Sequence, residues 1–153
     1  MFDRNDPADL AALKSEVNTD PLGIGYDPLG GTQDILDLLN AKNYTVAKPK
    51  ISSALVRSAT TYDAYDTLAI DEQEWIRWMT GTDGFDEENM VVTDDLRTNL
   101  SGPGADSIWA PAHRDEMNAA MLALMDVPGS RAEVLFGYGT SISRDYWFAA
   151  RDS

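Results

Sequence analysis

The chain of 153 residues is 43% hydrophobic and 25% charged, which is the size and composition of one folded domain rather than of a disordered segment. Its 26 Asp and Glu against 12 Lys and Arg give a net charge of −14, which argues against binding to a nucleic-acid backbone, because that binding depends on cations. The chain has no cysteine, which excludes disulfides, thiolate metal sites and cysteine nucleophiles, and no apolar run is long enough to cross a bilayer.

Two helices are predicted within the first 41 residues. Asp6 is the predicted N-cap of the first helix, which begins at Pro7 and ends at Asn18. A second helix is predicted from Thr32 to about Ala41. Its apolar positions are too dense for a freely exposed helix, so we expect it to pack on both sides of that stripe.

The segment between these helices, DPLGIGYDPLGG (20–31), contains Asp-Pro-Leu-Gly twice. A phosphate-binding loop would need a lysine after its last glycine, and a dinucleotide fingerprint would need a third spaced glycine after a strand. Neither is present, and Asp20 and Asp27 add negative charge. Proline fixes φ, glycine permits positive φ, and aspartate accepts hydrogen bonds from nearby N–H groups, so the segment is typical of two successive turns.

The residues after the second helix predict a short strand and a short helix. Residues 42–52 alternate in polarity, but Pro49 limits them to a short or edge strand. Residues 53–60 are compatible with a short helix, and residues 62–68 are ambiguous.

A longer helix is predicted from Asp71 to Gly81, because Asp71 and Glu74 have the spacing of a capping box and Gly81 is a stop signal. Its apolar face, which we expect to lie in the core, consists of Trp75, Ile76, Trp78 and Met79. Another helix is predicted over residues 89–100, despite a run of β-branched residues near its start.

The last third of the chain predicts a loop and three helices. The loop is SGPGADS (101–107), and the longest helix of the chain is predicted to follow it from Pro111. The apolar face of that helix consists of Met117, Met121, Leu124 and Met125. A capping-box spacing at Ser130 and Glu133 begins the next helix, and Ser143 is the predicted N-cap of the last.

Six or seven helices with short connections are typical of an all-α protein. The loop 101–107 is too short and too central to indicate a domain boundary. We therefore predict a single helical domain over residues 1–153.

Few residues have the context that catalysis or metal binding needs. His113 has Asp115 nearby, but a place in the first turn of a helix favours an exposed surface residue. The acidic loop 83–89 offers oxygen ligands for calcium but does not match the EF-hand pattern, so a solvated loop is favoured. No serine-nucleophile elbow occurs. We predict a protein without catalytic residues, metal or cofactor.

Three aromatic residues, Tyr146, Trp147 and Phe148, follow one another near the C-terminus. A run of three cannot face one core across a helix, so at least one should be exposed or buried by a partner. Because tryptophan and tyrosine are favoured at interfaces, these three are the candidate partner-contact residues, with core packing as the alternative. We expect a segment of about 143–153 to dock on a partner, and its deletion to leave the helical fold largely intact.

Five motifs occur in order across nearly the whole chain: Leu-Lys-x-Glu (13–16), Asp-Pro-Leu-Gly-x-Gly-Tyr (20–26), Leu-Asn-Ala (39–41), Ser-Arg-Ala-Glu (130–133) and Gly-x-Gly-Thr (137–140). With a tryptophan-containing helix between them, this pattern resembles a group of short tailed-bacteriophage proteins. Most members are known only as hypothetical or virion-associated proteins, encoded among head and tail morphogenesis genes. The acidic insert and the second Asp-Pro-Leu-Gly are peculiar to this sequence.

The resemblance implies a structural virion protein without known catalytic residues. A helical protein of this size is similar in kind to the neck adaptors that form a ring beneath the portal. The resemblance thus predicts a head–tail connector that contacts the portal and other neck or tail proteins as a symmetric homo-oligomeric ring. DNA would pass through the ring without sequence-specific binding, and no membrane would be involved.

We expect such a protein to be made in the host cytoplasm, since its N-terminus lacks a secretory pattern, and to reside at the head–tail junction of the virion. One alternative is a soluble phage accessory protein, either an assembly chaperone or a host-directed inhibitor. A more distant alternative is a hydrolase with dispersed carboxylates, which would have no sequence signal.

Overall fold

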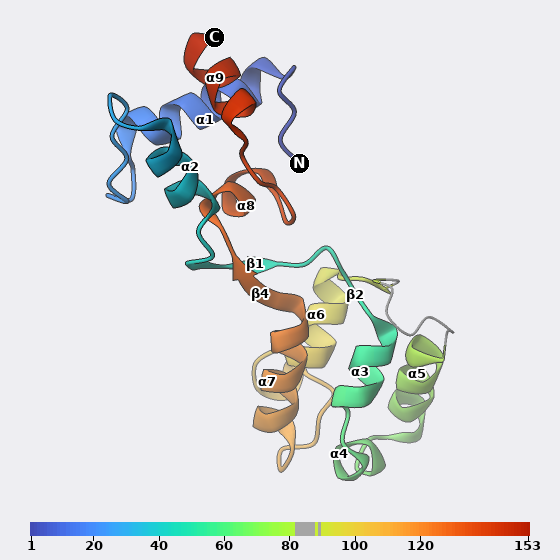
Figure 1. Ribbon diagram of the computed structural model, residues 1–153. Coiled ribbons are helices and arrows are strands. Elements are labelled where there is room, and N and C mark those ends of the chain that lie inside the picture. The colour runs from blue at the N-terminus through green and yellow to red at the C-terminus, as the bar shows by residue number, and fades with distance from the viewer. Residues whose placement is uncertain (82–87, 89) are drawn as a thin grey trace. The chain divides into compact units, whose positions relative to one another are not determined.

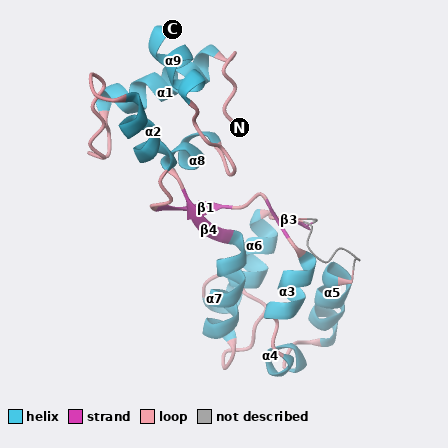
Figure 2. Ribbon diagram, in the orientation of Figure 1, coloured by secondary structure: helices cyan, strands magenta, loops and turns pink. Residues whose placement is uncertain are grey.

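Helices make up most of the computed structural model, which describes residues 1–81, 88 and 90–153. Within these ranges the chain forms nine α-helices, one short 3-10 helix and four short strands (Figure 1, Figure 2). The strands pair into two two-stranded sheets. The protein is therefore mostly helical, and the prediction of a purely all-α fold is wrong in this respect.

The chain divides into two compact units. Unit 1 comprises residues 1–46 and 128–153, and unit 2 comprises residues 47–127. Unit 2 is thus one continuous segment inserted between the two parts of unit 1. That the chain folds as a single domain stays a prediction.

Unit 1 has four helices, in which the first and last parts of the chain pack together. Its helices are α1 (Pro7–Thr19), α2 (Thr32–Asn40), α8 (Arg131–Phe136) and α9 (Arg144–Asp152). Helix α1 contacts α9, and α2 contacts both α8 and α9 (Figure 1). Their buried side chains form one core, which includes Leu13, Val17, Ile35, Leu39, Phe136 and Trp147.

The predicted helix starts of unit 1 are confirmed by their caps. The Asp6 carboxylate accepts a hydrogen bond of 2.9 Å from the N–H of Ala8. Ser130 and Glu133 form both hydrogen bonds of a capping box at the start of α8. The Ser143 hydroxyl accepts from the N–H of Tyr146 at the start of α9. Local side-chain chemistry thus sets where these helices begin.

The double turn between α1 and α2 is also confirmed. Asp20 has a φ of 41°, and its carboxylate accepts hydrogen bonds of 2.7 Å from the N–H groups of both Ile24 and Gly25. Gly23 and Gly25 have φ values of 64° and 97°, which a side chain would oppose. The Asp27 carboxylate accepts from the N–H two residues further on, at 3.0 Å. The segment's aspartates and glycines therefore shape the chain.

Unit 2 packs five helices around a second core (Figure 1). Its elements are β2 (Lys50–Ile51), α3 (Ser53–Ala59), α4 (Tyr62–Asp66), α5 (Ile70–Thr80), β3 (Met90–Val91), α6 (Asp94–Ser101), the 3-10 helix η1 (Gly104–Asp106) and α7 (Arg114–Met125). Helix α7 contacts α6 and α3, and α3 contacts α5. Strands β2 and β3 are antiparallel, with Lys50 opposite Val91 and Ile51 opposite Met90.

Methionines from one face of α7 fill the centre of the second core. Met117, Met121 and Met125 are completely buried, as their spacing of four residues predicts for one helical face. They lie in the same cluster as Trp109, whose indole N–H donates to the carbonyl oxygen of Leu100 at 2.8 Å.

The starts of α5 and α7 differ from the predictions. Helix α5 begins at Ile70, one residue before Asp71, because the backbone N–H of Ala69 donates to the Glu72 carboxylate at 3.0 Å. Helix α7 begins at Arg114, since the residues from Pro111 form a turn. With 12 residues it is not the longest helix, because α1 has 13.

The predicted helix over residues 89–100 is wrong in its first part. Met90 and Val91 form strand β3, and α6 begins at Asp94. Thr93 is the N-cap, and its hydroxyl accepts from the N–H of Leu96 at 3.1 Å. The β-branched run therefore adopts the extended conformation that such residues favour.

The chain passes between the units in two adjacent strands. Strands β1 (Tyr44–Ala47) and β4 (Asp126–Gly129) pair into a two-stranded sheet. On the unit 1 side, a Cβ atom added to Gly129 would lie 2.3 Å from Cγ2 of Val46. On the unit 2 side, the N–H of Lys48 donates to the carbonyl oxygen of Met125 at 2.8 Å. Each unit thus has its two crossing points close together.

Candidate functional site

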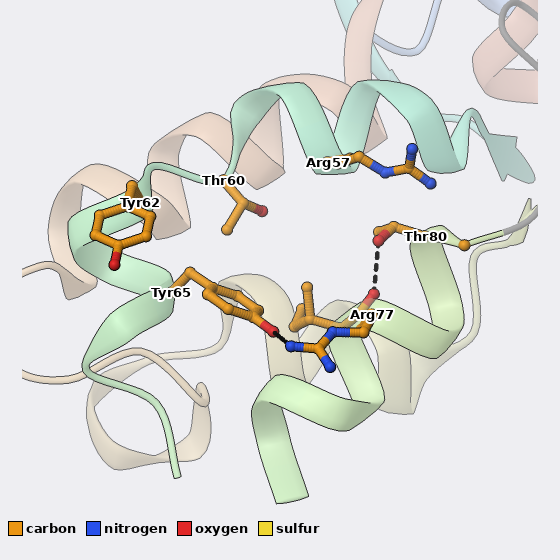
Figure 3. A pocket seen from close by; sticks show the side chains of 8 residues that line it. Arg57, Thr60, Tyr62, Tyr65, Arg77 and Thr80 are labelled. Carbon is orange, nitrogen blue, oxygen red and sulfur yellow. Dashed lines mark hydrogen bonds between the residues drawn. The ribbon is translucent and has the colours of Figure 1, made fainter. Parts of the chain in front are cut away.

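A pocket of about 470 Å³ lies in unit 2 among helices α3, α4 and α5 (Figure 3). Side chains from the end of α3, from α4 and from the second half of α5 line it, namely Arg57, Thr60, Tyr62, Tyr65, Arg77 and Thr80. Its volume is within the range of small-ligand sites, which is roughly 300 to 1,000 Å³.

Helical spacing brings these side chains to the pocket. Tyr62 and Tyr65 lie three residues apart on α4, and Arg77 and Thr80 lie three apart on α5, so each pair shares one helix face. Helix α4 begins where the Thr61 hydroxyl accepts from the N–H of Ala64 at 3.3 Å. The pocket is therefore built on short, capped helices.

Arg77 is held in the pocket by a chain of hydrogen bonds. Its guanidinium Nη2 donates to the Tyr65 hydroxyl at 3.1 Å (Figure 3). That hydroxyl donates to the carbonyl oxygen of Gln73 at 3.3 Å. The Gln73 side-chain amide in turn donates to the carbonyl oxygens of Tyr65 and Leu68, each at 3.2 Å. Tyr65 and Gln73 therefore position the guanidinium.

The lining of this pocket is positively charged, although the chain as a whole is acidic. Among the described residues, two arginines and no carboxylate line it. The described part of the chain offers neither Arg57 nor Arg77 a carboxylate within ion-pair distance. The hydroxyls of Thr60 and Thr80 donate to carbonyl oxygens of their own helices, at 2.8 and 2.7 Å. The guanidinium groups are thus the strong hydrogen-bond donors of the pocket.

A second, shallower depression of about 390 Å³ lies beside the two tryptophans of α5. Trp78 is 78% exposed and Trp75 is half-buried, so the prediction that Trp78 packs in the core is wrong. The buried face of α5 consists of Ile76, Met79 and Thr80, and at 100° per residue Trp78 points away from it.

The polar residues of the five sequence motifs lie in unit 1, where they bind one another. Glu16, only 4% exposed, accepts two hydrogen bonds of 2.7 and 2.9 Å from the Arg131 guanidinium. Hydrogen bonding to Glu16 raises the pKa of Arg131. Burial, reinforced by the Glu16 charge, raises the pKa of the nearby Tyr26 hydroxyl. These motif residues form a buried ion pair beside a buried tyrosine.

Glu133 links the Ser-Arg-Ala-Glu motif to the Gly-x-Gly-Thr motif. Its carboxylate accepts from the N–H groups of Ser130 at 2.7 Å and Gly139 at 3.0 Å, and it forms an ion pair with Lys42. Burial acts to raise its pKa, but the hydrogen bonds from Lys42, Ser130 and Gly139 outweigh burial and lower the pKa to about 2. Glu133 therefore stays ionised while it holds the turn after α8 in place.

Asn40 links the Leu-Asn-Ala motif to the segment before α9. Its side-chain amide donates to the carbonyl oxygen of Ile142 at 2.9 Å and accepts from the N–H of the same residue at 2.9 Å. The pair of hydrogen bonds satisfies the buried backbone of Ile142, which is 2% exposed.

The candidate partner-contact residues lie on α9 in unit 1. Trp147 is 2% exposed, and Tyr146 and Phe148 are half-buried. The ring of Tyr146 lies 5.1 Å from that of Phe2, and the Arg151 guanidinium lies 4.7 Å over the ring of Phe148. Because Trp147 is part of the core, the expectation that residues 143–153 can be removed with little effect on the fold is wrong. Contact of these aromatics with a partner stays a prediction.

The other candidate residues do not form a site in the described structure. His113 is the half-buried N-cap residue of α7 rather than an exposed residue of its first turn. The acidic loop 83–89 lies outside the described residues except for Glu88, which forms an ion pair with Lys48. In residues 1–81, 88 and 90–153, no group of three His, Asp or Glu is placed to hold a metal ion. No helix in those ranges is long and apolar enough to span a membrane.

Sequence reasoning did not identify Arg57, Tyr65 or Arg77. Their meeting depends on how three short helices pack, and 12 residues separate Tyr65 from Arg77. A signal that could have pointed to the arginines is the scarcity of basic residues in this chain.

A scan against protein-family models and searches of the curated proteins and the solved structures find no match to this chain.

Proposed function

We propose that this protein is a non-enzymatic structural component of a tailed-phage particle, and that it serves as a head–tail connector in a symmetric ring beneath the portal. The observation that carries the proposal is where the five motifs lie. All of them fall in unit 1, and residues of different motifs bind each other, as Glu16 does with Arg131 and Glu133 with Gly139.

This placement supports the resemblance because scattered chance matches would not be expected to meet in space. Glu16 and Arg131 are 115 positions apart in the chain. Motifs whose residues hold one core together form a more specific pattern than isolated short strings do. The link from the resemblance to a connector role comes from the phage context of the resembling proteins.

Exposed apolar side chains favour a role in assembly. Tyr62, Ile70 and Trp78 of unit 2 are each more than 75% exposed, as is Leu29 of unit 1. Large exposed aromatic and aliphatic residues are typical of protein–protein contacts. The net charge of −14 fits a ring through which DNA slides, since an acidic lining repels the phosphate backbone.

Mass spectrometry of purified particles of the encoding phage tests the proposal. A connector is expected at a fixed copy number relative to the portal protein. Native mass spectrometry of the recombinant protein mixed with the portal should then show a ring. If the protein is absent from particles, the connector proposal fails.

Two other functions make different predictions in the same experiment. An accessory protein, either a chaperone or a host-directed inhibitor, would be abundant in infected cells but missing from particles. A hydrolase with dispersed carboxylates would turn over substrates in a broad panel, and loss of that turnover on substitution of acidic residues would replace the structural proposal.

A further inference from the structure

The pocket among α3, α4 and α5 differs in charge from the chain that forms it. The sequence has 26 acidic and 12 basic residues, yet within residues 1–81, 88 and 90–153 two arginines and no carboxylate line this pocket. Elsewhere in the described chain, Arg97 pairs with Asp126 and Arg131 pairs with Glu16. In the described residues neither Arg57 nor Arg77 has one, so the charge of the pocket is uncompensated there.

One of these guanidinium groups is oriented in advance. Arg77 donates to the Tyr65 hydroxyl, and Tyr65 is tied to Gln73 through hydrogen bonds in both directions. A guanidinium has five N–H donors, so one hydrogen bond to Tyr65 leaves others for a ligand. Because its rotamer is already restrained, less conformational entropy would be lost when an anion binds.

The rest of the wall suits a flat apolar body. Ile76 lines the pocket and is only 3% exposed, and the rings of Tyr62 and Tyr65 stand at the α4 end (Figure 3). A ring that stacks against Tyr62 would bury apolar surface that is otherwise in contact with water, because Tyr62 is 77% exposed. The pocket therefore combines positive charge with an aromatic and aliphatic wall.

From this combination we propose that the pocket binds an oxyanion, a carboxylate or a phosphate, carried on an aromatic body. Arg77 and Arg57 bind the anionic oxygens, and Tyr62, Tyr65 and Ile76 contact the ring. The proposal concerns unit 2 alone and goes beyond the connector role. Of its residues, only Tyr62 also enters the argument for that role, as an exposed side chain.

A purely structural role for the arginines makes a distinct prediction. Both lie in the last turn of their helices, where a positive charge stabilises the helix dipole. If that is their whole role, replacing them lowers the stability of α3 and α5 and the pocket has no affinity for anions. A binding measurement on folded variants separates the two roles.

The experiment uses the full ¹⁵N-labelled chain and three matched probes: 2-naphthoate, 2-naphthyl phosphate and the neutral 2-naphthamide. We expect saturable amide shifts at Arg57, Tyr65 and Arg77 with one or both anions, at a Kd of about 1 mM or below. The neutral amide should bind at least about tenfold more weakly, because it cannot form charge-assisted hydrogen bonds. Comparison of the two anions identifies the preferred oxyanion.

Variants test the named residues. Arg77→Gln and Arg57→Gln should each weaken anion binding by about tenfold, the loss expected for one charge-assisted hydrogen bond. Tyr65→Phe should weaken it less, since the guanidinium remains but loses its positioning hydroxyl. Arg144→Gln, an exposed arginine of unit 1, is the control and should bind as the parent protein does. The amide spectrum of each variant confirms that it is folded.

Three results would overturn the proposal. The first is no saturable shift at the pocket with either anion up to about tenfold above the expected Kd. The second is equal affinity for 2-naphthamide. The third is unchanged anion affinity in folded Arg57→Gln and Arg77→Gln proteins, which would place the anion elsewhere.

Discussion

The two units of this protein differ in how their interiors are held together. Unit 1 buries two carboxylates, Glu16 and Glu133, each 4% exposed and each bound to a basic side chain. Unit 2 instead has three completely buried methionines on α7, packed with Trp109. The interior of unit 1 thus includes ion pairs between specific side chains. The interior of unit 2 depends on the packing of apolar side chains.

This difference explains why the recognisable motifs lie in only one unit. A buried ion pair needs particular residues at particular positions, because each charge must find its partner. Methionine is flexible and adapts to irregular space, so a methionine-rich core tolerates many sequences. The five sequence motifs therefore lie in unit 1. Unit 2 contains the pocket and the exposed Trp78.

Separating the units is the strongest test of the comparison. Residues 47–127 form one continuous segment whose ends meet where Lys48 binds the carbonyl oxygen of Met125, so unit 2 should fold when expressed alone. We expect a dispersed NMR spectrum that overlays on the unit 2 signals of the full chain, and a cooperative urea transition. If the fragment is unfolded, the chain is a single cooperative domain, as its sequence predicts.

The largest effect of a point substitution is expected at the buried ion pair. Arg131→Met leaves the Glu16 carboxylate buried without its partner, which should cost about 3–5 kcal/mol in the free energy of unfolding of unit 1. Urea unfolding followed at the indole signal of Trp147, the only tryptophan of unit 1, measures this loss.

The double variant Glu16→Met with Arg131→Met sharpens that test. Replacing both charges by apolar groups should recover much of the loss, since no unpaired charge is then buried. Arg144→Met is the matched control and should change stability by less than about 0.5 kcal/mol, because Arg144 is exposed. A single Arg131→Met variant as stable as the parent would contradict the importance of the pair.

Features set by neighbouring residues could be predicted from the sequence. The caps at Asp6, Ser130 and Ser143 and the double turn at Asp20 depend on side chains within a few positions of the backbone that they bind. Such contacts form whatever the rest of the chain does, so composition and spacing reveal them.

Features that need distant partners could not be predicted. Strand β2 exists because Ile51 lies opposite Met90, and two-residue strands have no periodicity of their own. The exposed position of Trp78 depends on which face of α5 meets α3, and the pocket depends on Arg77 meeting Tyr65. All three features result from tertiary packing, which cannot be predicted from the conformational preferences of single residues.

The next largest loss in the free energy of unfolding is expected for Gly129→Ala in unit 1, because the Gly129 backbone lies close to the Val46 side chain. Gly129→Ala would place a methyl group 2.3 Å from Cγ2 of Val46, so either β1 or β4 must shift. We expect a loss of about 1–3 kcal/mol, typical of overpacking, measured by urea unfolding. The compensating variant Gly129→Ala with Val46→Ala should be more stable than Gly129→Ala alone. If the losses in the free energy of unfolding caused by Gly129→Ala and Val46→Ala simply add in the double variant, the contact between these two residues does not matter for stability.

Acid should affect unit 1 through Glu133. Its pKa of about 2 lies below the ordinary value of 4.5, so its ionised form stabilises the fold above pH 4.5, and this stabilisation is lost as the pH falls towards 2. In Glu133→Gln the stability of unit 1 should change less with pH in that window. The exposed Glu74→Gln of unit 2 is the control. Identical pH profiles for the parent and Glu133→Gln would contradict this role of the carboxylate.

The smallest effect is expected at Trp78, which marks the surface of unit 2 rather than its core. Because the side chain is 78% exposed, Trp78→Ala should change the free energy of unfolding by no more than about 0.5 kcal/mol. By contrast, the indole of Trp147 in unit 1 is 2% exposed and belongs to the core. A large loss at Trp78 would mean that the indole is buried in solution, either by the chain or by a second copy. The dependence of that loss on protein concentration would separate these two explanations, since only burial by a second copy follows mass action.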